Sequence, residues 1–209
     1  SRLDRNGDYV QSNGQTRVDG TLDATGDVLL RGGTLGGTGT VCTVNNSSGE
    51  VTPGGSTGVL NVNGSYAQGP AGTLRIEIGG LTPGSEADQL AISGGAALDG
   101  ALRIEFVDGF MPSSGDAVTI LTAPGGRNGT FDGTCTTLPT TTGVGLRIAY
   151  TANSVAIEAL VTPDFGTWQT FHFPNDLGNP AVSGLGADPD GDGMPNLFEF
   201  GANTNPNLA

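Results

Sequence analysis

The chain has no lysine, and its eight basic residues are all arginines. Against 21 acidic residues they leave a formal net charge of -13. The field of such a protein repels nucleic-acid phosphates, so we expect no DNA or RNA partner. The same acidic surface favours solubility and concentrates divalent cations near the chain.

Long apolar segments are also missing. No run approaches the roughly 20 residues that a membrane-spanning helix needs, and the N-terminal segment from Ser1 to Asp4 lacks a hydrophobic signal core. We therefore expect a mature or trimmed product that does not span a membrane.

Cysteine is scarce, with only Cys42 and Cys135 present. Neither belongs to a CxxC pair or to a zinc-ligand pattern. A disulfide between them would close a long loop, contribute about 4 kcal/mol in the chain-entropy model, and require an oxidising compartment. We expect this disulfide; the alternative is two free, buried thiols.

The residues that catalysis needs are few. His172 is the only histidine, and no GxSxG nucleophile motif accompanies it. Lyases built on β-solenoids need basic residues to stabilise charge, and here only scattered arginines could serve. We predict no catalytic residue and no enzyme; a polysaccharide-active enzyme is the least supported alternative.

Glycine, in contrast, is abundant, with 37 residues. Short apolar segments bounded by glycine recur at irregular spacing up to about residue 100, which predicts many short strands joined by tight turns. Such segments bury an apolar face only by stacking or pairing. We predict an all-β fold in which β-solenoid-like coils pass into an antiparallel sheet or sandwich. Examples of the segments are Gly33-Thr34-Leu35, Gly58-Val59-Leu60-Asn61-Val62 and Gly72-Thr73-Leu74-Arg75-Ile76.

A sharper repeat links Leu74-Arg75-Ile76-Glu77-Ile78 with Leu102-Arg103-Ile104-Glu105-Phe106. Alternation places the apolar residues inward and Arg and Glu outward. In parallel, in-register pairing each arginine would face an arginine and each glutamate a glutamate, which is unfavourable. We therefore expect antiparallel or offset strands after about residue 70.

Glycine-bounded segments of related character run through roughly residues 7 to 160. They include Gly7-Asp8-Tyr9-Val10-Gln11, the glycine-rich segment 32–41, and Gly49-Glu50-Val51-Thr52-Pro53-Gly54-Gly55-Ser56. They continue in Gly64-Ser65-Tyr66-Ala67-Gln68, Asp88-Gln89-Leu90-Ala91-Ile92-Ser93-Gly94 and Phe110-Met111-Pro112-Ser113-Ser114-Gly115-Asp116. Over these residues the chain resembles the repeat region of autotransporter-like surface proteins. This resemblance implies a secreted, β-helical passenger-type region with a structural or adhesive role and no enzymatic residues.

The composition changes after Leu160. We divide the chain into an all-β domain (1–161), an aromatic linker or tail (162–187) and a calcium-binding loop with the C-terminus (188–209). The tail carries Phe165, Trp168, Phe171 and Phe173. We expect these rings to pack on the β domain or in a small local core; the alternative is insertion into a neighbouring copy.

The segment from Asp188 to Glu199 fits the twelve-position calcium loop, with carboxylates at positions 1, 3, 5 and 12 and Gly193 at position 6. Position 7 offers its backbone carbonyl and position 9 a side-chain oxygen. The predicted Ca²⁺ ligands are Asp188, Asp190, Asp192, Met194, Asn196 and Glu199.

Glycine and proline crowd the entering side of this loop, so we expect no long incoming helix. The loop is similar to those of dockerin modules and thrombospondin type 3 repeats, which implies a static calcium staple. Together these features predict an extracellular structural protein that self-assembles into a homopolymeric surface layer, fibre or filament. The alternative is a carbohydrate-binding or adhesive module with polysaccharide or cell-surface contacts.

Overall fold

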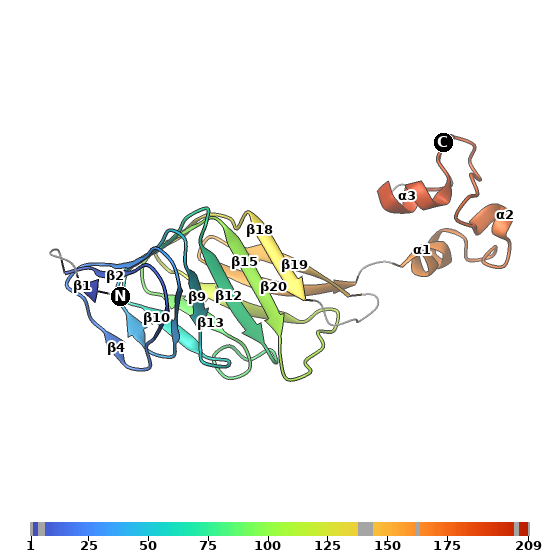
Figure 1. Cartoon of the computed structure of the whole chain (residues 1–209). Coiled ribbons are helices and arrows are strands. Elements are labelled where there is room, and N and C mark those ends of the chain that lie inside the picture. The colour runs from blue at the N-terminus through green and yellow to red at the C-terminus, as the bar shows by residue number, and fades with distance from the viewer. Residues whose placement is uncertain (1, 4–6, 138–143, 162–163, 203–204, 209) are drawn as a thin grey trace. The chain divides into compact units, whose positions relative to one another are not determined.

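The computed structural model describes residues 2–3, 7–137, 144–161, 164–202 and 205–208. It contains many strands and a few short helices (Figure 1). The chain divides into two compact units, Ser1–Leu160 and Val161–Ala209, called here the β unit and the C-terminal unit. The expected segments 162–187 and 188–209 thus lie in one compact unit.

The strands form three sheets, named A, B and C. Sheet A has the order β1 (Arg2–Leu3), β2 (Tyr9–Gln11), β5 (Val28–Leu30), β8 (Val44–Asn46), β11 (Tyr66–Gln68), β14 (Ala96–Leu98) and β17 (Arg127–Gly129). Sheet B has the order β18 (Gly133–Thr137), β15 (Ala101–Phe106), β12 (Thr73–Ile78), β9 (Glu50–Pro53), β6 (Thr34–Gly37) and β3 (Gln15–Arg17). Sheet C has the order β19 (Val144–Tyr150), β20 (Ser154–Val161), β16 (Ala117–Thr122), β13 (Gln89–Ile92), β10 (Val59–Val62), β7 (Thr40–Val41) and β4 (Thr21–Leu22).

Each strand from β2 to β15 pairs in parallel with the strand three places later in the chain, so that β2 pairs with β5 and β15 pairs with β18. Three consecutive strands, one in each sheet, therefore make one layer of the stack, called here a rung. Residues at the same place in successive rungs lie above one another, as Leu35, Val51, Leu74 and Leu102 do in sheet B. All four are fully buried and belong to one apolar cluster filled from the three sheets.

The repeated Arg-Glu strands contradict one expectation. β12 and β15 are parallel and in register, with Arg75 opposite Arg103 and Glu77 opposite Glu105. Antiparallel pairing after residue 70 is thus wrong for these strands; β16 and β20 do pair antiparallel.

One diagonal ion pair and two pairs along single strands explain why the like charges tolerate this register. Arg75 Nη2 lies 2.6 Å from the carboxylates of both Glu77 and Glu105, and Arg103 Nε lies 3.0 Å from Glu105. The bonded Glu105 raises the pKa of Arg75, and the guanidinium lowers the pKa of Glu105. Attraction along the diagonal therefore outweighs repulsion across the ladder.

The expected disulfide is wrong as well, because Cys42 carries a free thiol whose Sγ lies 3.3 Å from Gly26 O. Cys42 directly follows β7 and precedes the rung of β8, β9 and β10, whereas Cys135 lies on β18. Three strand spacings separate β9 from β18, or about 14 Å at the usual spacing. Disulfide-bonded residues have Cα atoms less than about 7 Å apart.

Buried amide side chains close the corner between sheets A and B. Gln68 is 4% exposed. Its Nε2 donates to the carbonyls of Gly72, Asp99 and Ala101 at 3.2, 2.7 and 3.0 Å, and its Oε1 accepts from the Tyr66 hydroxyl at 2.7 Å. One amide thus satisfies groups from two successive rungs, which ties those rungs together.

The C-terminal unit contains α1 (Phe165–His172), α2 (Pro180–Ser183) and α3 (Asn196–Ala202). The Asp164 side chain caps α1 by accepting from Thr167 N at 2.6 Å, and Asn179 caps α2 with Pro180 at the first helical position. The described chain is mostly strand with few helices, which agrees with the all-β expectation, although its sheets are parallel and mixed. The sequence signals for these helices are weak because each helix has at most eight residues.

We expect Gln68→Leu to lower the free energy of unfolding by about 3 kcal/mol, because it leaves buried polar partners unsatisfied. Gln15→Leu is the matched control, since Gln15 is exposed on β3. Denaturant titrations of both variants measure the difference. Equal stabilities for the two variants would contradict the proposed role of this amide.

Asp88 gives a prediction about pH. This carboxyl group is 1% exposed and accepts from Gly58 N and Glu77 N, each at 2.9 Å. Burial disfavours the charged form and raises the pKa to about 7, whereas an unfolded aspartate titrates near about 3.9. Between these values the folded state binds the extra proton, so the stabilising contribution is complete below about pH 4 and is lost as the pH rises through 7.

The free energies of unfolding of wild type and Asp88→Asn, measured between pH 4 and pH 8, check this sign. We expect the difference, wild type minus variant, to fall as the pH rises. A difference that stays constant or increases over that range is incompatible with a raised pKa at Asp88.

Candidate metal centre

Aromatic rings form the core of the C-terminal unit. Trp168 on α1 is 7% exposed. Its ring centroid lies 5.4 Å from that of Phe165, 5.9 Å from Phe173 and 6.0 Å from Phe200 on α3. The expectation of a small local core is confirmed for these rings, whereas Phe171 is 79% exposed. This core fixes the helix that follows the acidic loop.

The only histidine belongs to the same cluster. The His172 ring lies 4.7 Å from Trp168 and 4.9 Å from Phe171. His172 thus packs within the aromatic cluster of the C-terminal unit.

Backbone hydrogen bonds close the acidic loop at its base. Asn196 N donates to Ala187 O at 2.8 Å, and Leu197 N donates to Leu185 O at 3.0 Å. The Asn196 side chain is fully buried, and its Nδ2 donates to Val182 O and Gly184 O, both at 2.9 Å. The two ends of the loop are therefore held together independently of any ligand.

Within the loop, Asp188 organises the turn. Its carboxylate accepts from Gly191 N and Gly193 N, both at 3.0 Å. Both glycines have positive φ, 76° and 91°, which a side chain at either position would oppose. Gly193 at position 6 thus adopts a positive φ that glycine tolerates and other residues oppose.

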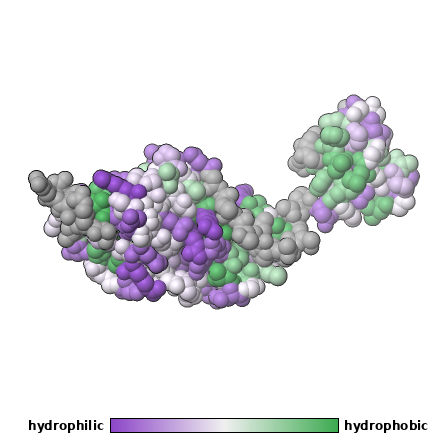
Figure 2. Space-filling model, in the orientation of Figure 1, coloured by the Kyte–Doolittle hydropathy of each residue, from purple (hydrophilic) through white to green (hydrophobic). Residues whose placement is uncertain are grey.

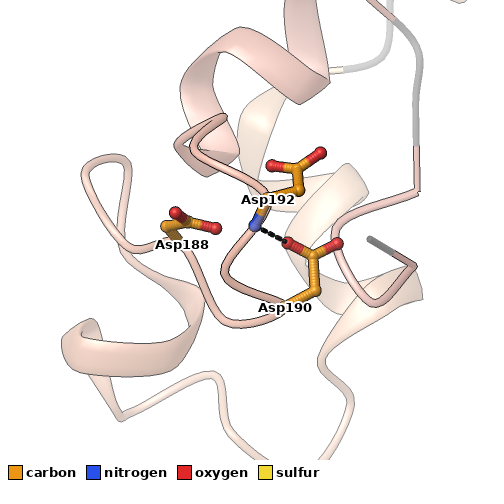
Figure 3. Close-up of side chains that lie close together, drawn as sticks. All are labelled: Asp188, Asp190 and Asp192. Carbon is orange, nitrogen blue, oxygen red and sulfur yellow. Dashed lines mark hydrogen bonds between the residues drawn. The ribbon is translucent and has the colours of Figure 1, made fainter.

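The turn brings three carboxylates together. Oxygens of Asp188, Asp190 and Asp192 all lie within 4.8 Å of one another. Figure 3 shows the three side chains on one tight loop, with Asp192 N donating to Asp190 Oδ1 at 3.3 Å. Asp192 in turn accepts from Met194 N at 2.7 Å. Two oxygens bound to one Ca²⁺ lie at most about 5 Å apart, so this spacing suits a shared ion.

Two buried oxygens give independent support. Asp190 Oδ2 and Asn196 Oδ1 are both buried and make no hydrogen bond in the part of the chain described here. They occupy positions 3 and 9 of the loop. A buried oxygen without a partner is costly, and a hard cation that takes oxygen ligands would compensate both.

The remaining predicted ligands are placed less directly. Met194 contributes a backbone N–H to Asp192, as described above. Glu199 is 1% exposed and lies in the first turn of α3, but it is not among the described carboxylates that lie within 4.8 Å of one another.

Charge balance in this unit also favours a cation. From residue 161 to residue 209 the sequence contains no arginine or lysine, but it contains the acidic residues Asp164, Asp176, Asp188, Asp190, Asp192 and Glu199. Arginines neutralise carboxylates in the β unit, as at Glu105. No basic side chain other than His172 belongs to this segment, so a bound divalent cation would supply the missing charge.

The residues present therefore fit calcium: all the available groups are oxygens, and two of them are buried without a hydrogen-bond donor. Asp188, Asp190, Asp192 and Asn196 would hold the ion, with Met194 and Glu199 completing the sphere. Its chemistry would be structural, because a calcium ion held by a loop joins the chain segments on either side.

Sequence reasoning missed one polar site, a cavity on the outer face of sheet B lined by Arg17, Arg75, Glu77 and Asp88. Arg17 and Asp88 are far in the chain from Arg75 and Glu77 on β12, and only the folding of the rungs brings the four together. The sequence matches no protein-family model and no curated protein.

We expect Asp190→Asn to weaken Ca²⁺ binding at least about tenfold, because it removes a charged oxygen ligand. Asp176→Asn is the matched control, since it makes the same charge change at an exposed position outside the loop. Calorimetric titration measures both affinities. Trp168, the only tryptophan, provides a fluorescence signal from the adjacent core. Equal affinities in the two variants would rule out this loop as the site.

Proposed function

We propose that this protein is an extracellular structural protein whose copies associate into a surface layer, fibre or filament, and that calcium stabilises its C-terminal unit. The single observation that carries the proposal is that β3 and β4 are the terminal strands of sheets B and C. β4 lies at the same end of the β unit as the N-terminus (Figure 1). Terminal strands are templates for pairing with another chain.

The hydrogen bonds of β4 show which groups are available. Thr40 N on β7 donates to Gly20 O at 2.8 Å, and Thr21 lies opposite Thr40 in a parallel ladder. In a parallel ladder, when one residue directs its N–H and C=O toward the neighbouring strand, the residue opposite it on that strand directs its own N–H and C=O away from the ladder. The backbone groups of Thr21 therefore face away from β7 and toward an incoming strand.

The rungs support the interpretation of the β unit as a short β-solenoid of the passenger type. Each rung contacts its neighbours through backbone ladders and the shared apolar cluster, as repeat proteins do. A second copy that continued the ladders would extend the same arrangement without a new kind of contact. This is why we propose a scaffold role, and we propose no catalytic residue.

The proposed calcium site favours a location outside the cell. Extracellular calcium modules bind with dissociation constants of about 10⁻⁴ to 10⁻³ M, which suits millimolar calcium. No helix in the described part of the chain has the length and hydrophobicity to cross a membrane. The proposed location is therefore the cell surface or the surrounding medium.

Electron microscopy of the purified protein, with Ca²⁺ and with a chelator, tests the proposal. We expect ordered polymers at high protein concentration in Ca²⁺. Particles that stay monomeric at every concentration, with or without Ca²⁺, would overturn the assembly function.

A substitution on β4 tests the edge itself. Thr21→Pro removes a backbone donor that faces away from β7, so the β unit should fold while polymerisation falls strongly. Thr21→Val keeps the N–H and serves as control. Light scattering follows assembly, and circular dichroism checks the fold. Normal polymerisation of a folded Thr21→Pro protein would show that copies do not meet through this strand.

A further inference from the structure

The outer face of sheet B contains a cavity of about 110 Å³. It extends across β3, β6, β9 and β12 and is bounded by the segment that follows β9. Figure 2 shows strongly hydrophilic surface over β12 and β15, beside this region. Its polar side chains come from three of the four rungs it crosses and are Gln15, Arg17, Thr52, Ser56, Arg75, Glu77 and Asp88.

Glycines create the hollow. Gly36 occupies the outward row of the sheet, between Arg17 and Thr52 in register. A Cβ atom at this position would lie 2.5 Å from Thr52 O and Oγ1, so no larger residue fits without a shift. Gly37 and Gly54 exchange two backbone hydrogen bonds of 2.9 Å. The floor of the cavity is therefore backbone that ladder bonds hold in place.

The rim is also fixed. A Cβ atom on Gly55 would lie 2.0 Å from Arg17 Nη1, so glycine at this place lets the guanidinium lie against the chain. Asp88 Oδ1 accepts from Gly58 N at 2.9 Å, and the hydroxyl of Thr57 donates to Ser85 O at 2.9 Å. These bonds anchor the segment after β9 and give the cavity a defined shape before any ligand binds.

The charges in the cavity are balanced. Arg17 and Arg75 face Glu77 and Asp88, two cations and two carboxyl groups. Arg75 also pairs with Glu105, and Arg17 pairs with Asp19 at 2.6 Å. A strongly charged ligand would meet repulsion as well as attraction here. A neutral ligand with many hydroxyl groups, each of which both donates and accepts, matches guanidinium donors and carboxylate acceptors together.

The lining also excludes apolar ligands. Among the described lining residues, Pro53 is the only apolar side chain, and none is aromatic. Drug-sized apolar pockets are larger, about 300 to 1,000 Å³. The small volume and the polar walls suit a single sugar ring.

We propose that this cavity binds one saccharide unit, so that the scaffold holds a polysaccharide on the outer face of sheet B. Arg17 and Gln15 at the exposed rim donate to the sugar hydroxyls, and Glu77 accepts from them. Thr52 supplies a further hydroxyl on the floor. The proposal is independent of assembly through β4, because the cavity lies on the sheet face and not on the terminal strand.

Saturation-transfer NMR of the full chain with glucose, galactose, mannose, N-acetylglucosamine and galacturonic acid, each at millimolar concentration, tests this proposal. We expect at least one neutral sugar to bind. Binding of galacturonic acid alone would contradict the charge-balanced site, and no binding by any sugar would overturn the proposal.

Two variants locate the site. Arg17→Met removes a donor at the exposed rim, where the arginine side chain is 55% exposed, and should weaken binding about tenfold. Arg31→Met is the matched control, at an exposed arginine outside the cavity. Thr52→Val removes the floor hydroxyl at nearly constant volume and should also weaken binding. Unchanged affinity in both cavity variants would assign the sugar to another surface.

Discussion

The β unit depends on one constraint, the in-register parallel stacking of successive rungs. Stacking places each side chain above the residue that holds the same place one rung earlier. For the apolar column from Leu35 to Leu102 this arrangement is favourable, because every side chain in it is buried among other apolar side chains. For Arg75 and Arg103 the stacking is unfavourable by itself. The fold tolerates it because the flexible side chain of Arg75 places its guanidinium against Glu105 along the diagonal.

The C-terminal unit has carboxylates that its own side chains do not neutralise. It has no arginine with which to form such diagonals, and its acidic oxygens converge on one turn. Where the β unit neutralises carboxylates with its own side chains, this unit offers hard oxygen ligands to an ion from solution. The aromatic packing of Trp168 on Phe200 holds α3 beside the loop. An ion bound at this loop would therefore be coupled to the packing of the aromatic core.

The sequence predicted those features that depend on neighbours in the chain. Strand alternation, the glycines at turns and the carboxylate triad are local, and the structure contains them. Pairing partners are not local: the charge argument for Arg75 considered only directly opposed residues and omitted the diagonal, and the Cys42–Cys135 expectation lacked the rung spacing. The helices were missed because a few residues around Trp168 carry too little periodic signal. The sheet B cavity depends on Gly36 lying beside Arg17, a contact that only the register creates.

The strands of sheet B lengthen along the stack, from three residues in β3 to four in β6 and β9 and six in β12 and β15. The β unit is consequently a tapered body with a narrow and a broad end. Two copies joined narrow end to narrow end form a closed pair that cannot grow. Copies joined narrow end to broad end leave a fresh site each time, so growth has a direction and leaves part of every broad end uncovered.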